Sequence, residues 1–157
     1  MNAASVLDRL DRKILKALQA DGRLTNQALS DAVALSPSAC LARVRRLERD
    51  GFIQGYHARL DPLRLNVGLI IFAEVVLKSH GADDHSTFVE LVTHVPQIVE
   101  ASHVSGPYDY LLKVVAESID DWTLITDRLT GEGGAERVTT LVLLNKPKIF
   151  VGYPVRS

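Results

Sequence analysis

Cysteine is almost absent from the sequence, since Cys40 is the only one among 157 residues. A single thiol excludes an internal disulfide framework and a cysteine-based zinc site. No stretch approaches the roughly 20 apolar residues of a membrane-spanning helix, because Glu74 interrupts the longest apolar run, Val67 to Leu77. Charged residues begin at Asp8 and Arg9, so the N-terminal region has no signal-peptide core, and we expect a cytoplasmic protein.

Positive and negative charges are nearly balanced overall, but they are unevenly distributed. Residues 1–60 carry ten Lys and Arg against six Asp and Glu, whereas residues 61–157 carry eight against thirteen. A basic first part joined to an acidic remainder indicates two modules with different partners, and nucleic acid is the candidate partner of the basic module. An uneven distribution of surface charges, without separate partners for the two modules, is the alternative explanation of the same counts.

The first module has the pattern of three helices followed by a hairpin. Apolar residues recur every three or four positions in its first segment, as in an amphipathic helix, at Leu7, Leu10, Ile14 and Leu18. Thr25 is placed to cap a second helix, and Ser36-Pro37 is placed to open a third that runs to Asp50. The weak alternation from Phe52 to Leu60 predicts a strand pair, or wing.

The second module alternates strand and helix patterns. We predict strands over residues 67–77, 98–104, 108–116 and 138–144, with helices capped by Asp83 or Asp84 and by Ser118. This βαββαβ order is the ferredoxin-like arrangement, an antiparallel sheet with helices on one face. The predicted fold class is therefore α+β, with domains at residues 1–60 and 67–157 and a hinge at residues 61–66.

The third helix carries the strongest functional signal. Its apolar positions Leu41, Val44 and Leu47 share one side, and Cys40 falls on that side, which predicts a buried thiol. The opposite side holds small residues first and cationic residues further along, namely Ser38, Ala39, Ala42, Arg46 and Arg49. Such a face suits the major groove of DNA, where small residues allow close approach and Arg contacts bases or phosphates. A solvated basic helix is the alternative, but the two short helices and tight turn before it favour DNA binding.

The first strand of the second module is apolar on both faces. Ile71 and Val75 point to one side, and Ile70, Phe72 and Val76 point to the other. A sheet with helices on one face only should be polar on its other face. Because too little chain remains for an internal second layer, a second copy is expected to cover that face, which predicts a homodimer.

Enzyme motifs are weak in this sequence. The five histidines have no metal-ligand spacing, and the pairs Asp83-Asp84 and Asp120-Asp121 precede helical patterns as caps do. Residues 131–134 form a Gly-containing loop without the Lys-Ser/Thr of a phosphate-binding loop. We therefore expect no catalytic residues, no metal and no cofactor, with a ferredoxin-like metabolic enzyme or enzyme-regulatory subunit as the alternative class.

Several segments in register resemble the Lrp/AsnC family of transcription regulators, also called leucine-responsive or feast/famine regulators. The segments are Leu7-Asp8-Arg9-Leu10-Asp11, Leu35-Ser36-Pro37-Ser38, Arg43-Val44-Arg45-Arg46-Leu47-Glu48, Gly51-Phe52-Ile53-Gln54-Gly55-Tyr56 and Gly106-Pro107-Tyr108-Asp109-Tyr110-Leu111-Leu112. The resemblance implies an N-terminal winged helix-turn-helix and a C-terminal ligand-sensing domain that dimerises and often assembles into octamers. It also implies an amino acid as effector, bound between sensing domains, and a two-fold promoter site in double-stranded DNA.

The resemblance carries particular roles to particular residues. The DNA-contacting positions it implies are Ser36, Ser38, Arg43 and Arg46, followed by Arg45 and Arg49, and the wing adds His57 and Arg59, for which an ordinary hairpin surface is an equal alternative. The effector positions it implies are Ser105, Gly106, Tyr108, Asp109, Tyr110, Thr139 and Thr140.

Two residues depart from the family pattern. Ala34 stands where the family commonly has Gly, and it is strained if the turn needs a positive φ. Pro107 stands where many members have Asp or Asn, and it removes an N–H donor from the effector turn. Asp109 suits the ammonium group of an amino acid, and a turn-capping carboxylate is the alternative role.

Overall fold

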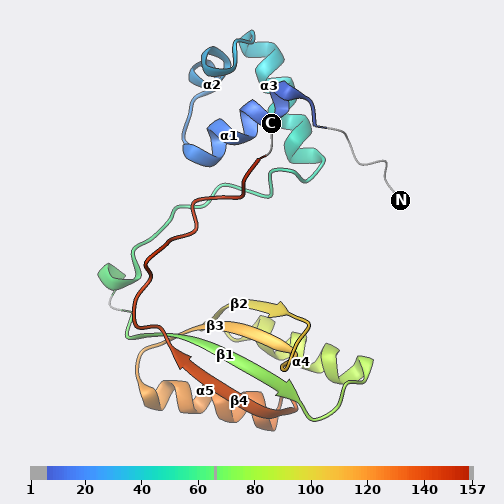
Figure 1. Cartoon of the computed structure of the whole chain (residues 1–157), viewed down its shortest axis with the longest axis vertical. Coiled ribbons are helices and arrows are strands. Elements are labelled where there is room, and N and C mark those ends of the chain that lie inside the picture. The colour runs from blue at the N-terminus through green and yellow to red at the C-terminus, as the bar shows by residue number, and fades with distance from the viewer. Residues whose placement is uncertain (1–6, 66, 156–157) are drawn as a thin grey trace. The chain divides into compact units, whose positions relative to one another are not determined.

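The computed structural model describes residues 7–65 and 67–155, and the chain divides into two compact units. The first unit takes the described residues up to Arg59 together with those from Lys148 onward, and the second unit is Leu60–Pro147. The tail from Lys148 therefore groups with the first unit, whereas the sequence places it in the second domain (Figure 1).

Three helices form the first unit: α1 (Arg9–Ala20), α2 (Asn26–Val33) and α3 (Pro37–Arg49). The side chain of Thr25 accepts a hydrogen bond from the N–H of Ala28, and that of Ser36 accepts one from the N–H of Ala39. Both caps confirm the sequence prediction, as does Pro37 in the first turn of α3.

A small apolar core holds these helices together. Its buried members come from all three helices and are Ile14, Leu29, Val33, Cys40 and Leu47. The Cys40 thiol is fully buried, as predicted, and burial raises its pKa. A thiol in that state is a core side chain and not a reactive one.

The strand pair predicted over Phe52 to Leu60 is wrong. The described backbone from Phe52 to Leu60 contains no strand, and it runs as an extended segment with a positive φ of 153° at Gly55. An isolated two-stranded hairpin is marginal in water because it buries little apolar surface. The weak alternation of this segment is insufficient to stabilise one.

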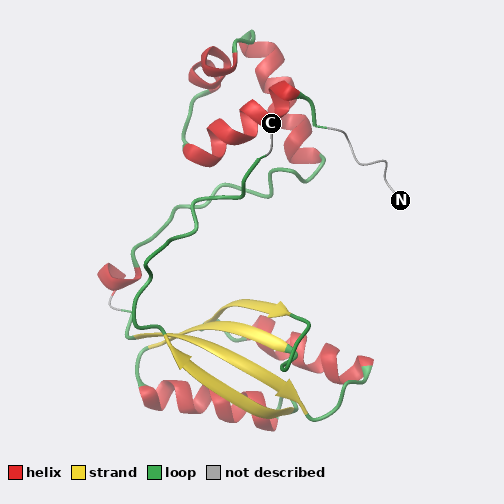
Figure 2. Ribbon diagram, in the orientation of Figure 1, coloured by secondary structure: helices red, strands yellow, loops and turns green. Residues whose placement is uncertain are grey.

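The second unit is a four-stranded antiparallel sheet with two helices on one face, as Figure 2 shows. Its elements are β1 (Leu69–Leu77), α4 (Ala82–His94), β2 (Ile98–His103), β3 (Tyr110–Ala116), α5 (Ile119–Gly131) and β4 (Ala135–Val142). The strand order β2-β3-β1-β4 confirms the ferredoxin-like arrangement.

Burial alternates along the central strands. Ile71, Ala73 and Val75 of β1 are buried under the helices, while Ile70 and Phe72 on the other face are only half-buried. Phe88 of α4 and Trp122 of α5 belong to the buried cluster. The face opposite the helices, which we call the open face, therefore carries apolar side chains beside Glu74 and Lys113, and no helix covers it within the described residues.

Some element boundaries differ from the sequence prediction. The cap position of α4 is Gly81, not Asp83 or Asp84, and the Asp84 carboxylate accepts the Gly81 N–H. Helix α5 ends at Gly131, the first residue of the predicted loop, and β4 begins earlier than expected, at Ala135. The predicted hinge contains a 3₁₀ turn, η1 (Pro62–Leu65), while Asn66 lies outside the described residues.

The C-terminal tail is hydrogen-bonded to α1. The Gln19 side chain donates to the Tyr153 carbonyl at 2.8 Å and accepts the Tyr153 N–H at 2.9 Å. Gly152 next to it has a φ of 129°, and a Cβ at that position would collide with the Gln19 side chain. Glycine at position 152 therefore allows the tail to approach α1 closely.

Among the described residues, none of the helices has the length and apolar character that crossing a membrane requires.

Candidate nucleic-acid interface and effector site

Helix α3 exposes most of the polar face that the sequence predicts. Ser38, Arg45 and Arg49 are exposed, while Leu47 packs inward. Leu41, which the helical wheel places inward, is 39% exposed. The exposed face of α3 is therefore small and hydroxyl-bearing at its start and cationic towards its end, with one apolar side chain on its border.

Two of the predicted DNA-contacting arginines are instead paired with aspartates at the start of α1. Arg43 Nη1 lies 2.6 Å from the Asp8 carboxylate and 2.8 Å from the Asp11 carboxylate, and Arg46 Nη2 lies 2.5 Å from that of Asp11. The Asp11 side chain is completely buried, and the Arg43 and Arg46 side chains are 29% and 32% exposed. These four residues, which we call the α1–α3 charge cluster, fix α3 against α1.

The charge cluster shifts the pKa values of its carboxyls. The N–H of Asp11 and then the Arg43 guanidinium lower the pKa of Asp8 to about 2. Burial raises the pKa of Asp11, but hydrogen bonds from Arg46, the Asp8 N–H and Arg43 outweigh it and lower that pKa overall. Hydrogen bonds to Asp8 and Asp11 raise the pKa of Arg43. All four groups are therefore charged at neutral pH.

The predicted effector turn, residues 105–109, connects β2 to β3 and lies beside the end of β1. The Val104 N–H donates to the Asp109 carbonyl at 2.9 Å, and the Asp109 N–H donates to the Val75 carbonyl at 2.8 Å. Within the described residues, the N–H groups of Ser105, Gly106 and Tyr108 have no hydrogen-bond partner. The turn therefore offers three unoccupied donors to an anion, although Pro107 supplies none.

The Asp109 carboxylate is already engaged inside the chain. It accepts the Leu77 N–H at 2.8 Å, and its other oxygen lies 3.2 Å from His80 Nε2. These contacts match the turn-organising role that the sequence left as the alternative to ligand binding. Asp109 therefore shapes the turn through one contact on each of its carboxylate oxygens.

Tyr110 also contacts two histidines, one on helix α4 and one on the neighbouring strand β2. Its hydroxyl lies 2.9 Å from His85 Nδ1, and the His103 ring stacks on it with ring centroids 4.9 Å apart. The sequence prediction did not place His80, His85 and His103 beside the effector turn, because sequence spacing does not show which residues of different elements meet. Among the described residues, no group of three or more His, Cys, Asp or Glu is arranged to hold a metal ion.

Thr139 and Thr140 do not reach the effector turn within one chain. They lie on β4, and β1 separates β4 from β3, so two strand spacings of about 4.8 Å each intervene. The Thr140 hydroxyl accepts a hydrogen bond from Trp122 Nε1 at 3.1 Å. The structure therefore brings together the turn residues of the predicted effector set but not the two threonines.

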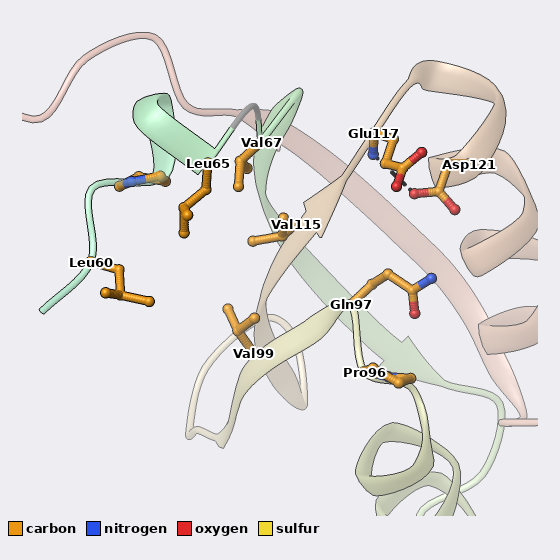
Figure 3. A pocket seen from close by; sticks show the side chains of 10 residues that line it. Leu60, Leu65, Val67, Pro96, Gln97, Val99, Val115, Glu117 and Asp121 are labelled. Carbon is orange, nitrogen blue, oxygen red and sulfur yellow. Dashed lines mark hydrogen bonds between the residues drawn. The ribbon is translucent and has the colours of Figure 1, made fainter. Parts of the chain in front are cut away.

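A pocket of about 700 Å³ lies elsewhere on the second unit (Figure 3). Leu60, Leu65 and Val67 form one side of it, and Val99 and Val115 form another. The pocket also includes Pro96 and Gln97, which precede β2, and Glu117, which follows β3. It therefore lies at the opposite end of the β2–β3 pair from the effector turn.

Two family models match the chain, one for each unit. The model described as winged helix-turn-helix DNA-binding matches residues 7–54, and the model described as the Lrp/AsnC ligand binding domain matches residues 70–151. The first match contains α1, α2 and α3, and the second contains almost the whole sheet with both of its helices.

Characterised relatives and solved structures agree with these matches. The chain is 43% identical over 143 residues to the leucine-responsive regulatory protein of Klebsiella pneumoniae, covering 90% of this chain and 87% of the relative. A transcriptional regulator from Neisseria meningitidis, solved as a complex with L-Met, has a TM-score of 0.87 and 34% identity, covering 95% of this chain and 97% of that one. An AsnC family transcriptional regulator from Agrobacterium tumefaciens has a TM-score of 0.85 and 33% identity, covering 94% and 97%.

Proposed function

The chain belongs to the Lrp/AsnC family of DNA-binding transcriptional regulators, and from this premise we propose which of its residues bind DNA and effector. The exposed face of α3 is the observation that carries the proposal. Ser38, Arg45 and Arg49 would make the main contacts to duplex DNA, with the hydroxyl near base edges and the cations on bases or phosphates. Ser36, whose hydroxyl caps α3, would place the N-terminus of α3 at a phosphate.

Arg43 and Arg46 take a different part in this proposal. Each is tied to Asp8 or Asp11, so their first role is to hold α3 in position on α1. Arginine has five N–H donors, and both side chains remain partly exposed. Each can therefore contact a phosphate in addition to its aspartate.

The effector is proposed to be a free amino acid at the turn of residues 105–109. Its carboxylate would accept the N–H groups of Ser105, Gly106 and Tyr108, which lack partners in the described chain. The L-Met complex of the Neisseria meningitidis regulator supports an amino-acid effector of this class. Thr139 and Thr140 would contribute only from the second subunit of a dimer.

Dimerisation is proposed to cover the open face of the sheet. Ile70, Phe72 and Leu141 are half-buried or exposed there, although they are apolar. A second copy would supply the missing layer. The dimer would then present two α3 helices to a two-fold DNA site, and assembly into an octamer is the further step that the family resemblance implies.

The proposed setting follows from the DNA partner. A regulator of chromosomal genes acts where the bacterial chromosome lies, so we place the protein in the cytoplasm. Its named relatives are regulators, and we assign the chain no catalytic activity.

The replacement Arg45→Ala tests the DNA interface. Arg45 is exposed, so its removal should leave the thermal unfolding temperature unchanged. It should lower the affinity of the protein for DNA from upstream of its own gene. If Arg45 contacts a phosphate, the log–log slope of affinity against salt should fall by about one. Fluorescence anisotropy titrations at several salt concentrations measure both quantities.

The matched control is Lys78→Ala, an exposed cation of the second unit, which should leave DNA binding as it is. Equal binding by Arg45→Ala and the unchanged protein would remove Arg45 from the interface. The same titration in the presence of L-Met and of L-Leu tests the effector site. At least one of them should shift the dissociation constant of the unchanged protein, and no shift with either would contradict an effector of this class.

A further inference from the structure

Helix α1 has a second basic surface that the proposed interface on α3 does not use. Four cationic side chains, Arg9, Arg12, Lys13 and Lys16, surround a hollow of about 450 Å³. Their spacing of three, four and seven residues places them on one side of the helix, over a length of roughly 10 Å. We call this set the α1 stripe.

The α1 stripe is not neutralised by the chain. Within the part of the sequence that the structure describes, none of its four side chains takes part in an ion pair. The acids nearest to it in sequence, Asp8 and Asp11, are instead bound to Arg43 and Arg46 of α3. The carboxylates of Asp8 and Asp11 are therefore already paired within the α1–α3 charge cluster. Within the described residues, the positive charge of the α1 stripe has no negative charge paired with it.

The α1 stripe points away from α3. Asp11 faces α3 and is completely buried. At about 100° per residue, the four cations lie roughly 100–200° around the helix from Asp11. They therefore cannot contact the stretch of duplex that lies against α3.

We propose that the α1 stripe binds the phosphate backbone of a second stretch of duplex DNA, separate from the stretch that α3 contacts. Duplex DNA presents one negative charge per about 1.7 Å of its axis, so several phosphates face a stripe of this length. A chain that already holds DNA through α3 also keeps further segments of the same molecule at high effective concentration. The proposal rests on DNA binding by α3, and it implies that the protein bends DNA around itself or bridges two duplexes.

The acidic surface of another copy is the competing occupant. Residues 61–157 carry thirteen Asp and Glu against eight Lys and Arg, so a like-chain contact with the stripe would be attractive. Those thirteen acids are spread over residues 61–136, however, whereas a duplex presents one negative charge per about 1.7 Å of its axis. The observations therefore favour DNA.

The test uses the full chain with Lys13→Ala/Lys16→Ala and, as a matched control, Lys78→Ala/Lys146→Ala, which also removes two exposed cations. Each protein is titrated with a duplex of about two helical turns and with one of about ten turns carrying the same site. On the long duplex, the stripe variant should bind more weakly, and its log–log salt slope should fall by about 0.9 for each phosphate that the stripe no longer neutralises. On the short duplex, it should match the unchanged protein and the control.

An unchanged slope on the long duplex, with binding by α3 intact, would overturn this proposal alone. A lower molar mass of the stripe variant in light scattering, again with an unchanged slope, would assign the stripe to contacts between copies and would also overturn it. Absence of binding by the unchanged protein to either duplex would instead overturn DNA binding itself, and the stripe proposal with it.

Discussion

Ala34 adopts a left-handed backbone conformation at the turn between α2 and α3, with φ 58° and ψ 51°. Among the described residues, it is the one non-glycine residue with a positive φ. A Cβ in this conformation contacts the neighbouring carbonyl oxygen too closely, at a cost of about 1–2 kcal/mol. The strain expected for alanine at a position that commonly holds glycine is therefore present.

The replacement Ala34→Gly should stabilise the protein. Relief of the strain exceeds the extra flexibility that glycine gives the unfolded chain, so we expect the free energy of unfolding to rise by about 0.5–1 kcal/mol. Urea denaturation followed by circular dichroism measures the difference. The control Ala32→Gly lies within α2 and should lower stability by about 1 kcal/mol. A drop in stability at both positions would show that Ala34 is not strained.

Candidate site residues could be named from the sequence, but their partners within the chain could not. Asp109 stands out as a carboxylate in a turn, yet its contact with the Leu77 N–H joins residues 32 positions apart. Arg46 stands out as a cation on an amphipathic helix, yet its aspartate lies on another helix. Periodicity describes one element at a time, so it cannot show which charges different elements bring together.

The α1–α3 charge cluster shows how two elements are held together by charge. Asp8 and Asp11 cap α1 through each other's N–H groups and also accept Arg43. One pair of carboxylates therefore both begins a helix and docks a second one. The same cluster leaves Arg45 and Arg49 as the exposed cations of α3.

Acid should weaken the docking of α3 on α1. The pKa of Asp8 is lowered from 3.8 to about 2, and that of Asp11 is lowered as well. A carboxyl with a lowered folded-state pKa stabilises the fold above its unfolded pKa, and this stabilisation disappears as pH falls through the folded-state pKa. We therefore expect the helical circular dichroism signal of the unchanged protein to become less resistant to heat between about pH 4 and pH 2.

The variant Asp11→Asn should lack this part of the acid sensitivity and should be less stable at neutral pH by about 2 kcal/mol, because charged hydrogen bonds to Arg43 and Arg46 are removed. Asp120→Asn is the control, since Asp120 lies in the first turn of α5 and is exposed. An acid profile of Asp11→Asn identical to that of the unchanged protein would contradict this role.

Elements with strong local signals were predictable, and those with weak signals were not. Thr25, Ser36 and Ser118 cap their helices as predicted, because a side-chain oxygen at that position satisfies an N–H two or three residues ahead. The strand pair over Phe52 to Leu60 was wrong, because alternation alone does not stabilise pairing without a third strand or a packed face. The start of β4 was also misplaced, because the strand begins at Ala135 and not at Val138.

At the scale of the whole molecule, the sheet of the second unit has apolar side chains on both faces, and the helices of a single chain cover only one of them. Helices α4 and α5 cover one face, and the open face keeps Ile70, Phe72 and Leu141 without a covering layer in the described chain. The strand order was predictable because the βαββαβ succession has few compact solutions. The partner of the open face cannot be derived from the order of the elements.

The replacement Phe72→Asp should break the proposed dimer. A carboxylate in the proposed interface would lose its water on association, at a cost that its cross-strand neighbour Lys113 offsets only in part. The molar mass in light scattering should fall towards that of one chain. The control Val89→Asp changes an exposed apolar residue of α4 and should leave the mass as it was. A Phe72→Asp protein with undiminished mass would place the interface elsewhere.

The central claim is that this chain recognises particular DNA sites through paired α3 helices. The most direct measurement is the ratio of dissociation constants of the unchanged protein for duplex from upstream of its gene and for random duplex of equal length, at one fixed salt concentration. Specific regulators prefer their sites by a factor of about 10³ or more, and we predict a ratio in that range. Equal dissociation constants for the two duplexes would contradict the account.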